Sequence, residues 1–272
     1  MRAITSGARP ALAAVLIAAS AGFARPAAAL PASQFSEYAS GLSRTAEGDD
    51  TLPETISLAY DVPGWASVFG SAATIGGALP RGEMQLELNA YVDPFNPLNG
   101  QALAAIRYYW AVEQVGGDPF DGRVPVDVET HGRVFSVVDT ASGGIGNLYA
   151  EAFFEIAGDT NHLYQANACL GVDCETGEFV FDEQFTVETT LNAANRVDLT
   201  VGGNGQLQNV GSFSFEGFVD PRIEISPSFA RRADFQLVFS NEVVPEPDAA
   251  WLSGAALAAI AFVSSSHRRA GG

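Results

Sequence analysis

The cysteines are the first side chains to consider for chemistry, because thiols act as nucleophiles, metal ligands and disulfide partners. The chain has two, Cys169 and Cys174, in the segment Cys-Leu-Gly-Val-Asp-Cys, where Gly171 allows a tight loop. In an oxidising compartment such a pair usually forms a disulfide, and closing so short a loop contributes about 2 kcal/mol. We therefore predict a disulfide between these two residues.

Two histidines, His131 and His162, are the remaining candidates for acid–base or metal chemistry in the body of the chain. Zinc sites use four ligands at short paired spacings, and the six residues between His162 and Cys169 do not match them. The sequence also lacks the Gly-x-Ser-x-Gly and His-Glu-x-x-His motifs of hydrolases. Each histidine is therefore interpreted as a surface or strand-end residue, and zinc is the less favoured alternative.

Oxygen-rich turns are candidate calcium ligands in proteins that work outside cells. Two such turns occur, at Asp93–Asn99 and Asp118–Asp121. Neither has the spacing of an EF-hand, and ordinary Asx turns explain both. We therefore predict no cofactor, with calcium at these turns as the alternative.

The composition excludes several classes of function. The chain has 272 residues with 32 acidic side chains, 14 arginines and no lysine, so its net charge is −18. An acidic surface repels nucleic acid and anionic lipid, and without lysine neither a Walker A loop nor Schiff-base catalysis is available. The glycine-rich Ser142–Gly146 is therefore interpreted as a turn. A glycosidase needs only two carboxylates, and the sequence neither selects nor excludes a pair.

The elements that must position these side chains are β-strands, predicted between residues 51 and 243. In the clearest case Ile106, Tyr108 and Trp110 alternate with Arg107 and Tyr109, so the two sets face opposite sides. This pattern favours a strand over a helix for 101–115. Further strands are predicted at 85–89, 124–128, 133–138, 148–156, 179–191, 196–201, 213–219, 222–225 and 233–244, with turns at 116–119, 158–159, 202–205 and 220–221. Together they predict one antiparallel β-sandwich of jelly-roll type.

Exposed aromatic rings would suit a sandwich that binds sugars. The candidates are Trp65, Tyr109 and Trp110. Core packing is the favoured role of each, because large rings contribute most when they are buried.

The N-terminus has the layout of a secretory signal peptide. Two arginines precede an apolar run over 11–21, and small residues follow it. We predict a signal peptide over 1–29, with cleavage after Ala29 or, as a second choice, after Ala24. The Ser- and Ala-rich stretch 30–50 is predicted to be a loose leader.

The C-terminus, 244–272, combines three elements in order. These are the motif Val244-Pro245-Glu246-Pro247, an apolar helix over about 249–266, and the basic pair Arg268 and Arg269. The prolines separate this tail from the body, and the apolar run falls short of the roughly 20 residues of a full span. The arginines should stay cytoplasmic by the positive-inside rule. The tail therefore predicts a temporary membrane anchor.

This order of elements resembles the PEP-CTERM sorting tail of Gram-negative bacteria, which also occurs on some ice-binding proteins and is sometimes named after them. The resemblance implies that an exosortase, a membrane-embedded cysteine transpeptidase-like enzyme, cuts near the Pro-Glu-Pro. It also implies a setting with exopolysaccharide machinery. The body is loosely similar to other PEP-CTERM ectodomains in its Tyr-rich strand at 107–110, its Val-Pro-Val strand at 124–126 and its Asp-Pro strand at 220–225.

These observations predict a non-enzymatic structural or adhesive protein of the cell surface or exopolysaccharide matrix. It would cross the inner membrane, remain anchored as a precursor and then be released at the surface or outside the cell. Its expected partners are the exosortase and exopolysaccharide. A carbohydrate-binding module is the first alternative, and a glycoside hydrolase with unrecognised carboxylates is the second.

Overall fold

The computed structural model describes residues 30–42, 44–48, 52–76, 80–91, 97–140, 145–171 and 176–240. The predicted signal peptide, Cys174 and the tail 244–272 lie outside these residues, and so does the side chain of Cys169. The disulfide, the sorting motif and the apolar helix therefore remain predictions. Within the described ranges, no helix combines the length and the apolar character needed to cross a membrane.

The described residues form thirteen strands and one short 3-10 helix. Alternating burial along most strands confirms the predicted period of two. The elements are β1 (Gln34–Gly41), β2 (Arg44–Glu47), β3 (Thr55–Val62), β4 (Ala66–Ile75), β5 (Arg81–Ala90), β6 (Leu98–Gln114), β7 (Arg123–Thr140), β8 (Ile145–Glu155), β9 (His162–Gly171), β10 (Gly177–Thr190), β11 (Asn195–Leu207), β12 (Gly211–Ile225), η1 (Arg232–Asp234) and β13 (Phe235–Phe239).

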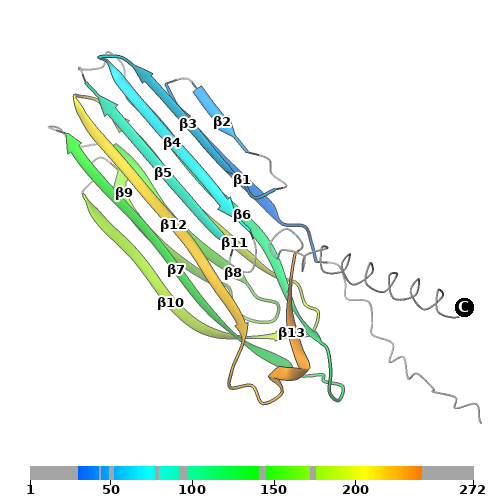
Figure 1. Cartoon of the computed structure of the whole chain (residues 1–272). Helices are drawn as coiled ribbons and strands as arrows, with labels where there is room; N and C mark the ends of the chain where they lie inside the picture. The colour runs from blue at the N-terminus through cyan, green and yellow to red at the C-terminus, as the bar shows by residue number, and fades with distance from the viewer. Residues whose placement is uncertain are drawn as a thin grey trace, which may run out of the picture.

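The strands make two antiparallel sheets packed face to face (Figure 1). Sheet A has the order β2-β1-β6-β11-β8-β9, and β13 pairs with the far part of β6. Sheet B has the order β10-β7-β12-β5-β4-β3. From β5 to β12 the chain changes sheet at every step except between β8 and β9, which is the strand order of a jelly roll. The predicted β-sandwich is therefore confirmed, and β1 to β4 widen it on one side.

The core lies between the two sheets and is rich in aromatic rings. Tyr108, Trp110, Phe154 and Phe215 are fully buried, and each of the two phenylalanine rings contributes about 1.5–3 kcal/mol by leaving water. The alternation predicted for 101–115 is confirmed, because Tyr108 and Trp110 face the core and Arg107 is exposed. The inward face of sheet A thus supports stability and leaves its outward face for other roles.

The leader predicted over 30–50 is not loose throughout, because β1 and β2 occupy most of it. Within β1, Phe35 and Ala39 are buried, and the polar residues Gln34, Ser36 and Ser40 face outward. The alternation was hidden because the charged Glu37 is among the buried residues and the aromatic Tyr38 is among the outward-facing ones. β1 pairs with β6 over its whole length and extends sheet A.

Two predicted turns lie inside strands. Gly202–Gly205 belongs to β11, and at Gly203 an added Cβ would lie 2.5 Å from Met84 Cε and 3.1 Å from Phe215 Cδ2. The glycine there accommodates close packing against the facing sheet and does not form a turn. Asp220 and Pro221 belong to β12, beyond Val219, where the pairing with β5 ends. Proline is tolerated there because the strand has become an edge on that side.

Candidate functional site

His131 and His162 lie in different sheets of the sandwich. His131 lies on β7 in sheet B, with Nδ1 3.0 Å from Asp182 Oδ1 and Nε2 3.5 Å from Glu129 Oε1. His162 lies on β9 in sheet A and stacks on Phe185, with ring centroids 4.3 Å apart. In the part of the chain that the structure describes, no group of three or more His, Cys, Asp or Glu side chains is placed to hold a metal ion.

The two oxygen-rich turns differ in what the structure describes of them. The turn Asp118–Asp121 lies between β6 and β7, and the carbonyl of Asp118 accepts a hydrogen bond of 2.7 Å from Gln114 Nε2. That carbonyl is thus engaged in fixing the turn to the end of β6. Most of the turn Asp93–Asn99 lies outside the described residues.

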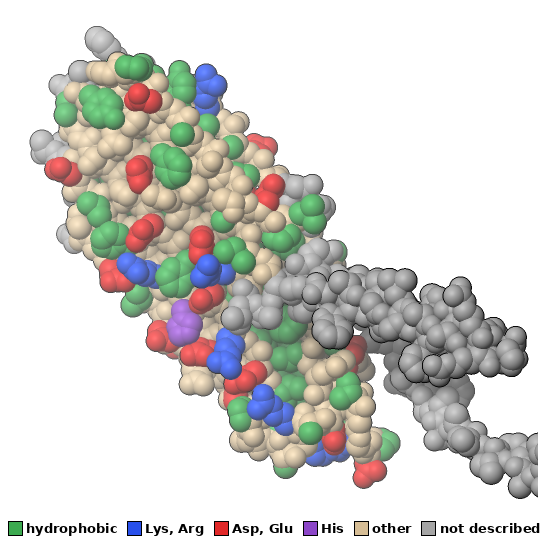
Figure 2. Space-filling model, viewed as in Figure 1, with side chains coloured by type: hydrophobic (Ala, Val, Ile, Leu, Met, Phe, Trp, Pro, Cys, Tyr) green, Lys and Arg blue, Asp and Glu red, His purple; other side chains and the backbone are tan. Residues whose placement is uncertain are grey.

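The outward face of sheet B carries charges of both signs. Figure 2 shows acidic and basic side chains interleaved over part of this face. Arg133 pairs with Glu178 at 2.8 Å and Glu216 at 3.6 Å, and Arg81 pairs with Glu83 at 2.7 Å. Because exposed ion pairs contribute little to stability, we interpret this face as a solvated surface that keeps the protein soluble.

Asp220 is an exception on this face because one of its carboxylate oxygens is buried. It lies opposite His131 on the neighbouring strand, and its Oδ1 is buried with no hydrogen-bond partner among the described residues. Burial raises the pKa of Asp220, and the charges of His131 and Arg81 oppose this effect. A raised carboxyl pKa means that ionisation of the group costs more free energy in the folded than in the unfolded state. The free energy of unfolding is therefore higher at acid pH and falls as the pH rises through the folded-state pKa.

Asp220→Asn is therefore expected to be more stable than the wild type at pH 7, because it removes the buried charge. The difference should vanish at pH 3, where the carboxyl is protonated in the wild type. Thermal unfolding at both pH values measures this. Asp182→Asn is the matched control, since that carboxylate is exposed and pairs with the same histidine. A neutral-pH melting temperature below that of the wild type would contradict the assignment.

The outward face of sheet A is different, because one end of it is rich in amides. The strand register places Gln101 between Ser40 and Asn204, and Asn204 next to Asn147. Residues in one such row lie side by side across neighbouring strands, and their side chains point the same way. One row further on, Gln206 Nε2 donates a hydrogen bond of 2.9 Å to Asn99 Oδ1.

Four of these amide side chains, on Asn99, Gln101, Asn204 and Gln206, belong to residues that line a groove of about 960 Å³ at the end of the sandwich, which we call the end groove. No acidic side chain is among its described lining residues, although the chain has 32 acidic residues in all. Among the described lining residues the one charged side chain is that of Arg44, whose guanidinium lies 4.6 Å from the centre of the Tyr60 ring. The lining residues are Ser40, Gly41, Leu42, Arg44, Thr45, Tyr60, Val62, Trp65, Pro97, Asn99, Gly100, Gln101, Ile145, Asn204, Gly205 and Gln206.

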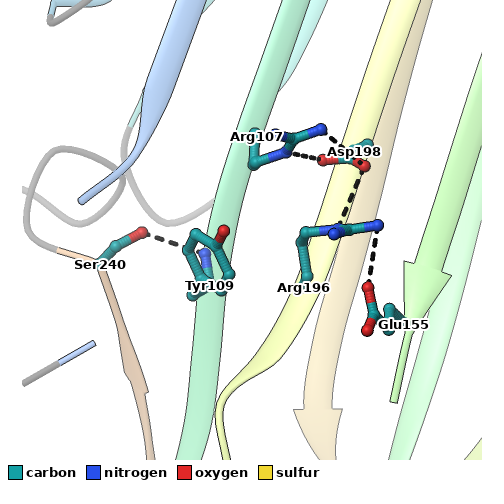
Figure 3. A network of polar contacts seen from close by, with 6 residues as sticks. All are labelled: Arg107, Tyr109, Glu155, Arg196, Asp198 and Ser240. Carbon is teal, nitrogen blue, oxygen red and sulfur yellow. Dashed lines mark hydrogen bonds and ion pairs between the residues drawn. The ribbon is translucent and has the colours of Figure 1, made fainter. Parts of the chain in front are cut away.

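A second groove of about 860 Å³, the side groove, lies on the outward face of sheet A. Beside it runs a ladder of ion pairs (Figure 3). Arg107 Nε is 2.6 Å and Arg196 Nε is 3.2 Å from the carboxylate of Asp198, and Arg196 Nη2 is 2.9 Å from Glu155 Oε2. The hydrogen bond to Asp198 raises the pKa of Arg107, so its charge is permanent.

The three aromatic residues considered as sugar ligands lie in different environments. Trp110 is fully buried in the core, as its favoured role predicted. Trp65 is half-buried, packs against the core and also lines the end groove. Tyr109 is half-buried and lines the side groove, and its backbone N–H donates a hydrogen bond of 3.1 Å to Ser240 Oγ.

The amides of the end groove were not predicted as site residues. The signal for them was present, because Asn99 and Gln101 share the outward parity of β6. Asn204 lies on β11, which pairs with β6. Because 202–205 was interpreted as a turn, the sequence did not indicate that Asn204 faces outward. Their convergence depends on the register between β6 and β11, which no single strand reveals.

Two pairs of carboxylates bear on the hydrolase alternative. Glu151 and Asp198 both line the side groove, where Asp198 is paired with Arg107 and Arg196. The side chains of Glu37 and Glu54 both approach Gly48. Glu37 is buried between the sheets and accepts a hydrogen bond from Thr74 Oγ1. Neither residue lines the end groove or the side groove. A glycosidase needs both carboxylates at the scissile bond, and this pair does not meet a ligand in either groove.

Comparisons with known proteins identify no family. No family model matches the chain, and no curated protein matches it. Among solved structures, the chain is similar to TmCBM61 in complex with β-1,4-galactotriose, at 9% identity over 74% of this chain and 87% of that chain, with a TM-score of 0.15. It is also similar to a structure of infectious bursal disease virus, Gt strain, at 11% identity over 84% of this chain and 73% of that chain, with a TM-score of 0.10. At these TM-scores neither structure assigns a fold family or a function to this chain.

Proposed function

We propose that this protein is a non-enzymatic adhesive module of the cell surface or extracellular matrix that binds neutral polysaccharide in the end groove. The observation that carries the proposal is a large groove lined by amides and free of described carboxylates, on a chain of net charge −18. Sugar hydroxyls both donate and accept hydrogen bonds, and the amides of Asn and Gln do the same. Trp65, which is half-buried and lines the groove, adds apolar surface for the faces of sugar rings.

The same lining supports binding over hydrolysis. Cleavage of a glycosidic bond needs a general acid and a second carboxylate on either side of the bond, and the described lining supplies neither. The less favoured hydrolase alternative would have to use carboxylates outside this groove. A purely structural protein would not need a groove of this kind, so glycan binding separates the adhesive from the structural function.

Export and sorting complete the proposal. The signal peptide over 1–29 would deliver the sandwich across the inner membrane, and the tail 244–272 would hold it until an exosortase removes the anchor. The support is the order of the Pro-Glu-Pro motif, the apolar run and the terminal arginines. A neutral exopolysaccharide outside the cell would then be the natural ligand of the groove.

The test is binding of the exported protein to a glycan array and its retardation in gels that contain neutral polysaccharides. The double variant Gln101→Ala with Asn204→Ala should weaken binding about 30-fold, because it removes hydrogen bonds of about 1 kcal/mol each. Its matched control is Gln85→Ala with Asn89→Ala, which removes two amides from the outward face of sheet B. Failure of the wild type to bind any neutral glycan, or equal losses in the two double variants, would refute the proposal.

A further inference from the structure

We propose that the binding face continues from the end groove across Tyr149 and Gly202 into the side groove, so that the ligand is an internal stretch of a linear polysaccharide. This inference rests on the proposed function and deepens it. It assigns a second subsite to residues that the end groove does not include.

The outward-facing residues that line the two grooves are separated by one row of residues, and the end groove also reaches Tyr60, Val62 and Trp65 at the end of the sandwich. Ser40, Gln101 and Asn204 line the end groove, and Ser36, Ala105 and Thr200, four residues away along β1, β6 and β11, line the side groove. All six share the outward parity of sheet A, and each set forms one row across the strands. A ligand leaving one groove along the strands therefore enters the other.

The intervening row provides a platform for a sugar ring. It contains Tyr38, Leu103, Gly202 and Tyr149, which are neighbours in the strand register. At Gly202 an added Cβ would lie 3.0 Å from Tyr149 Oη, 3.1 Å from Tyr149 Cζ and 2.9 Å from Leu103 Cδ1. The Tyr149 ring therefore extends over the glycine, and the missing side chain is what allows it to lie low on the sheet. Aromatic rings lying on a surface combine an apolar face with a polar tip.

The hydroxyl of Tyr149 is available as a neutral donor. Burial raises the pKa of Tyr149, and the charge of Glu151 adds to the effect. The group therefore keeps its proton at neutral pH. The half-buried ring and its protonated tip together suit a ligand with ring faces and hydroxyl groups.

The side groove has a floor of small residues between polar walls. Ser36, Ala105 and Thr200 leave the floor open. Asp198 in one wall is neutralised by arginines at 2.6 and 3.2 Å, and Glu151 accepts a hydrogen bond of 2.5 Å from Gln165 Nε2. Because these groups are already held in place by each other, they offer fixed hydrogen-bonding positions at little ordering cost. Paired charges also favour a neutral ligand over an anion.

The length of the face decides the class of ligand. From Asn99 to Arg107 along β6 it extends about 27 Å, at about 3.4 Å per residue, which is several times the length of one sugar ring. The ligand that fills both grooves is therefore a chain segment and not a monosaccharide or a chain end.

The test compares neutral oligosaccharides of increasing length, from disaccharide to octasaccharide, in the cello, xylo and galacto series. Affinity for the series that the wild type binds should rise until the chain spans both grooves. Gly202→Val should displace Tyr149, reduce binding of the longest chain about tenfold and leave binding of the shortest bound fragment within about twofold. Tyr149→Ala removes the ring without crowding and should give the same pattern. Gly116→Ala is the matched control, because an added Cβ there meets no atom within 4 Å.

The outcomes separate the two proposals. If short and long chains bind equally, or if Gly202→Val and Tyr149→Ala weaken all lengths alike, the extended face is refuted and the end groove stands. If no oligosaccharide or polysaccharide binds, the proposed function fails and this inference fails with it. Unfolding temperatures of both variants establish that losses of binding are not losses of fold.

Discussion

Asn195→Asp is expected to destabilise the sandwich by about 3 kcal/mol or more at neutral pH. Asn195 is fully buried at the start of β11, and all of its polar atoms are engaged. Its Oδ1 accepts hydrogen bonds from Ala157 N at 2.9 Å and Thr189 Oγ1 at 3.1 Å, and its Nδ2 donates to the carbonyls of Trp110 at 3.3 Å and Ala193 at 3.1 Å. A carboxylate keeps the accepting atom and turns the donor into a second acceptor facing two carbonyls.

The loss should depend on pH. Burial disfavours the charged form, so the folded-state pKa of the introduced carboxyl should exceed its value in the unfolded chain. Stability relative to the wild type is therefore highest at acid pH, where the protonated group can donate to one carbonyl, and falls as pH rises through the folded pKa. Urea unfolding at pH 4 and pH 7 measures this difference.

Asn204→Asp is the matched control, because Asn204 is an exposed asparagine on the same strand. Surface substitutions of this kind usually change stability by less than about 0.5 kcal/mol. Equal losses in the two variants would show that the buried amide has no special role. If the loss of stability in Asn195→Asp does not vary with pH, its cause would instead be disturbed packing and not the buried charge.

Mature protein from the native host is expected to lack the peptide Ala249–Gly272. The apolar run is shorter than the roughly 20 residues that match a bilayer, and Arg268 and Arg269 each cost about 2.5–3.5 kcal/mol at the centre of a membrane helix. The basic end should therefore stay inside and hold the Pro-Glu-Pro at the outer surface, within reach of a membrane enzyme. Mass spectrometry of the intact protein measures the processed length.

Substitution of Pro245, Glu246 and Pro247 by Ala should leave an uncut precursor in the membrane fraction. Glu242→Ala is the control, since it removes a nearby carboxylate from outside the motif. It should be processed like the wild type. If most wild-type molecules still carry Ala249–Gly272, the protein is a permanently anchored ectodomain, and the sorting proposal is wrong.

Local sequence determined the class of fold. The alternation of Tyr108 and Trp110 with Arg107 and Tyr109 identifies both the strand and its buried side, because side chains of successive strand residues point to opposite faces. The glycines and proline at 116–119 likewise lie between strands, as predicted. These features depend on residues only a few positions apart, so one segment is enough to reveal them.

Only the tertiary structure decided what Gly203, Pro221 and the β1 segment do. Gly203 looks like a turn residue until Met84 and Phe215 of the facing sheet are placed against it. Pro221 is expected to break a strand. It is accommodated in β12 because the pairing of β12 with β5 ends at Val219, just before it. In each case the deciding contact comes from a segment distant in the chain, so no local pattern carries it.

The candidate site shows the same division. Sequence alone offered aromatic rings as sugar ligands, and burial then assigned Trp110 to the core. The amides Gln101 and Asn204 are about a hundred positions apart and meet because β6 and β11 pair in one register. A shift of one residue in that register would turn one set of side chains to the other face. Strand composition therefore determined that polar residues face outward, and strand order and register determined which of them form a groove.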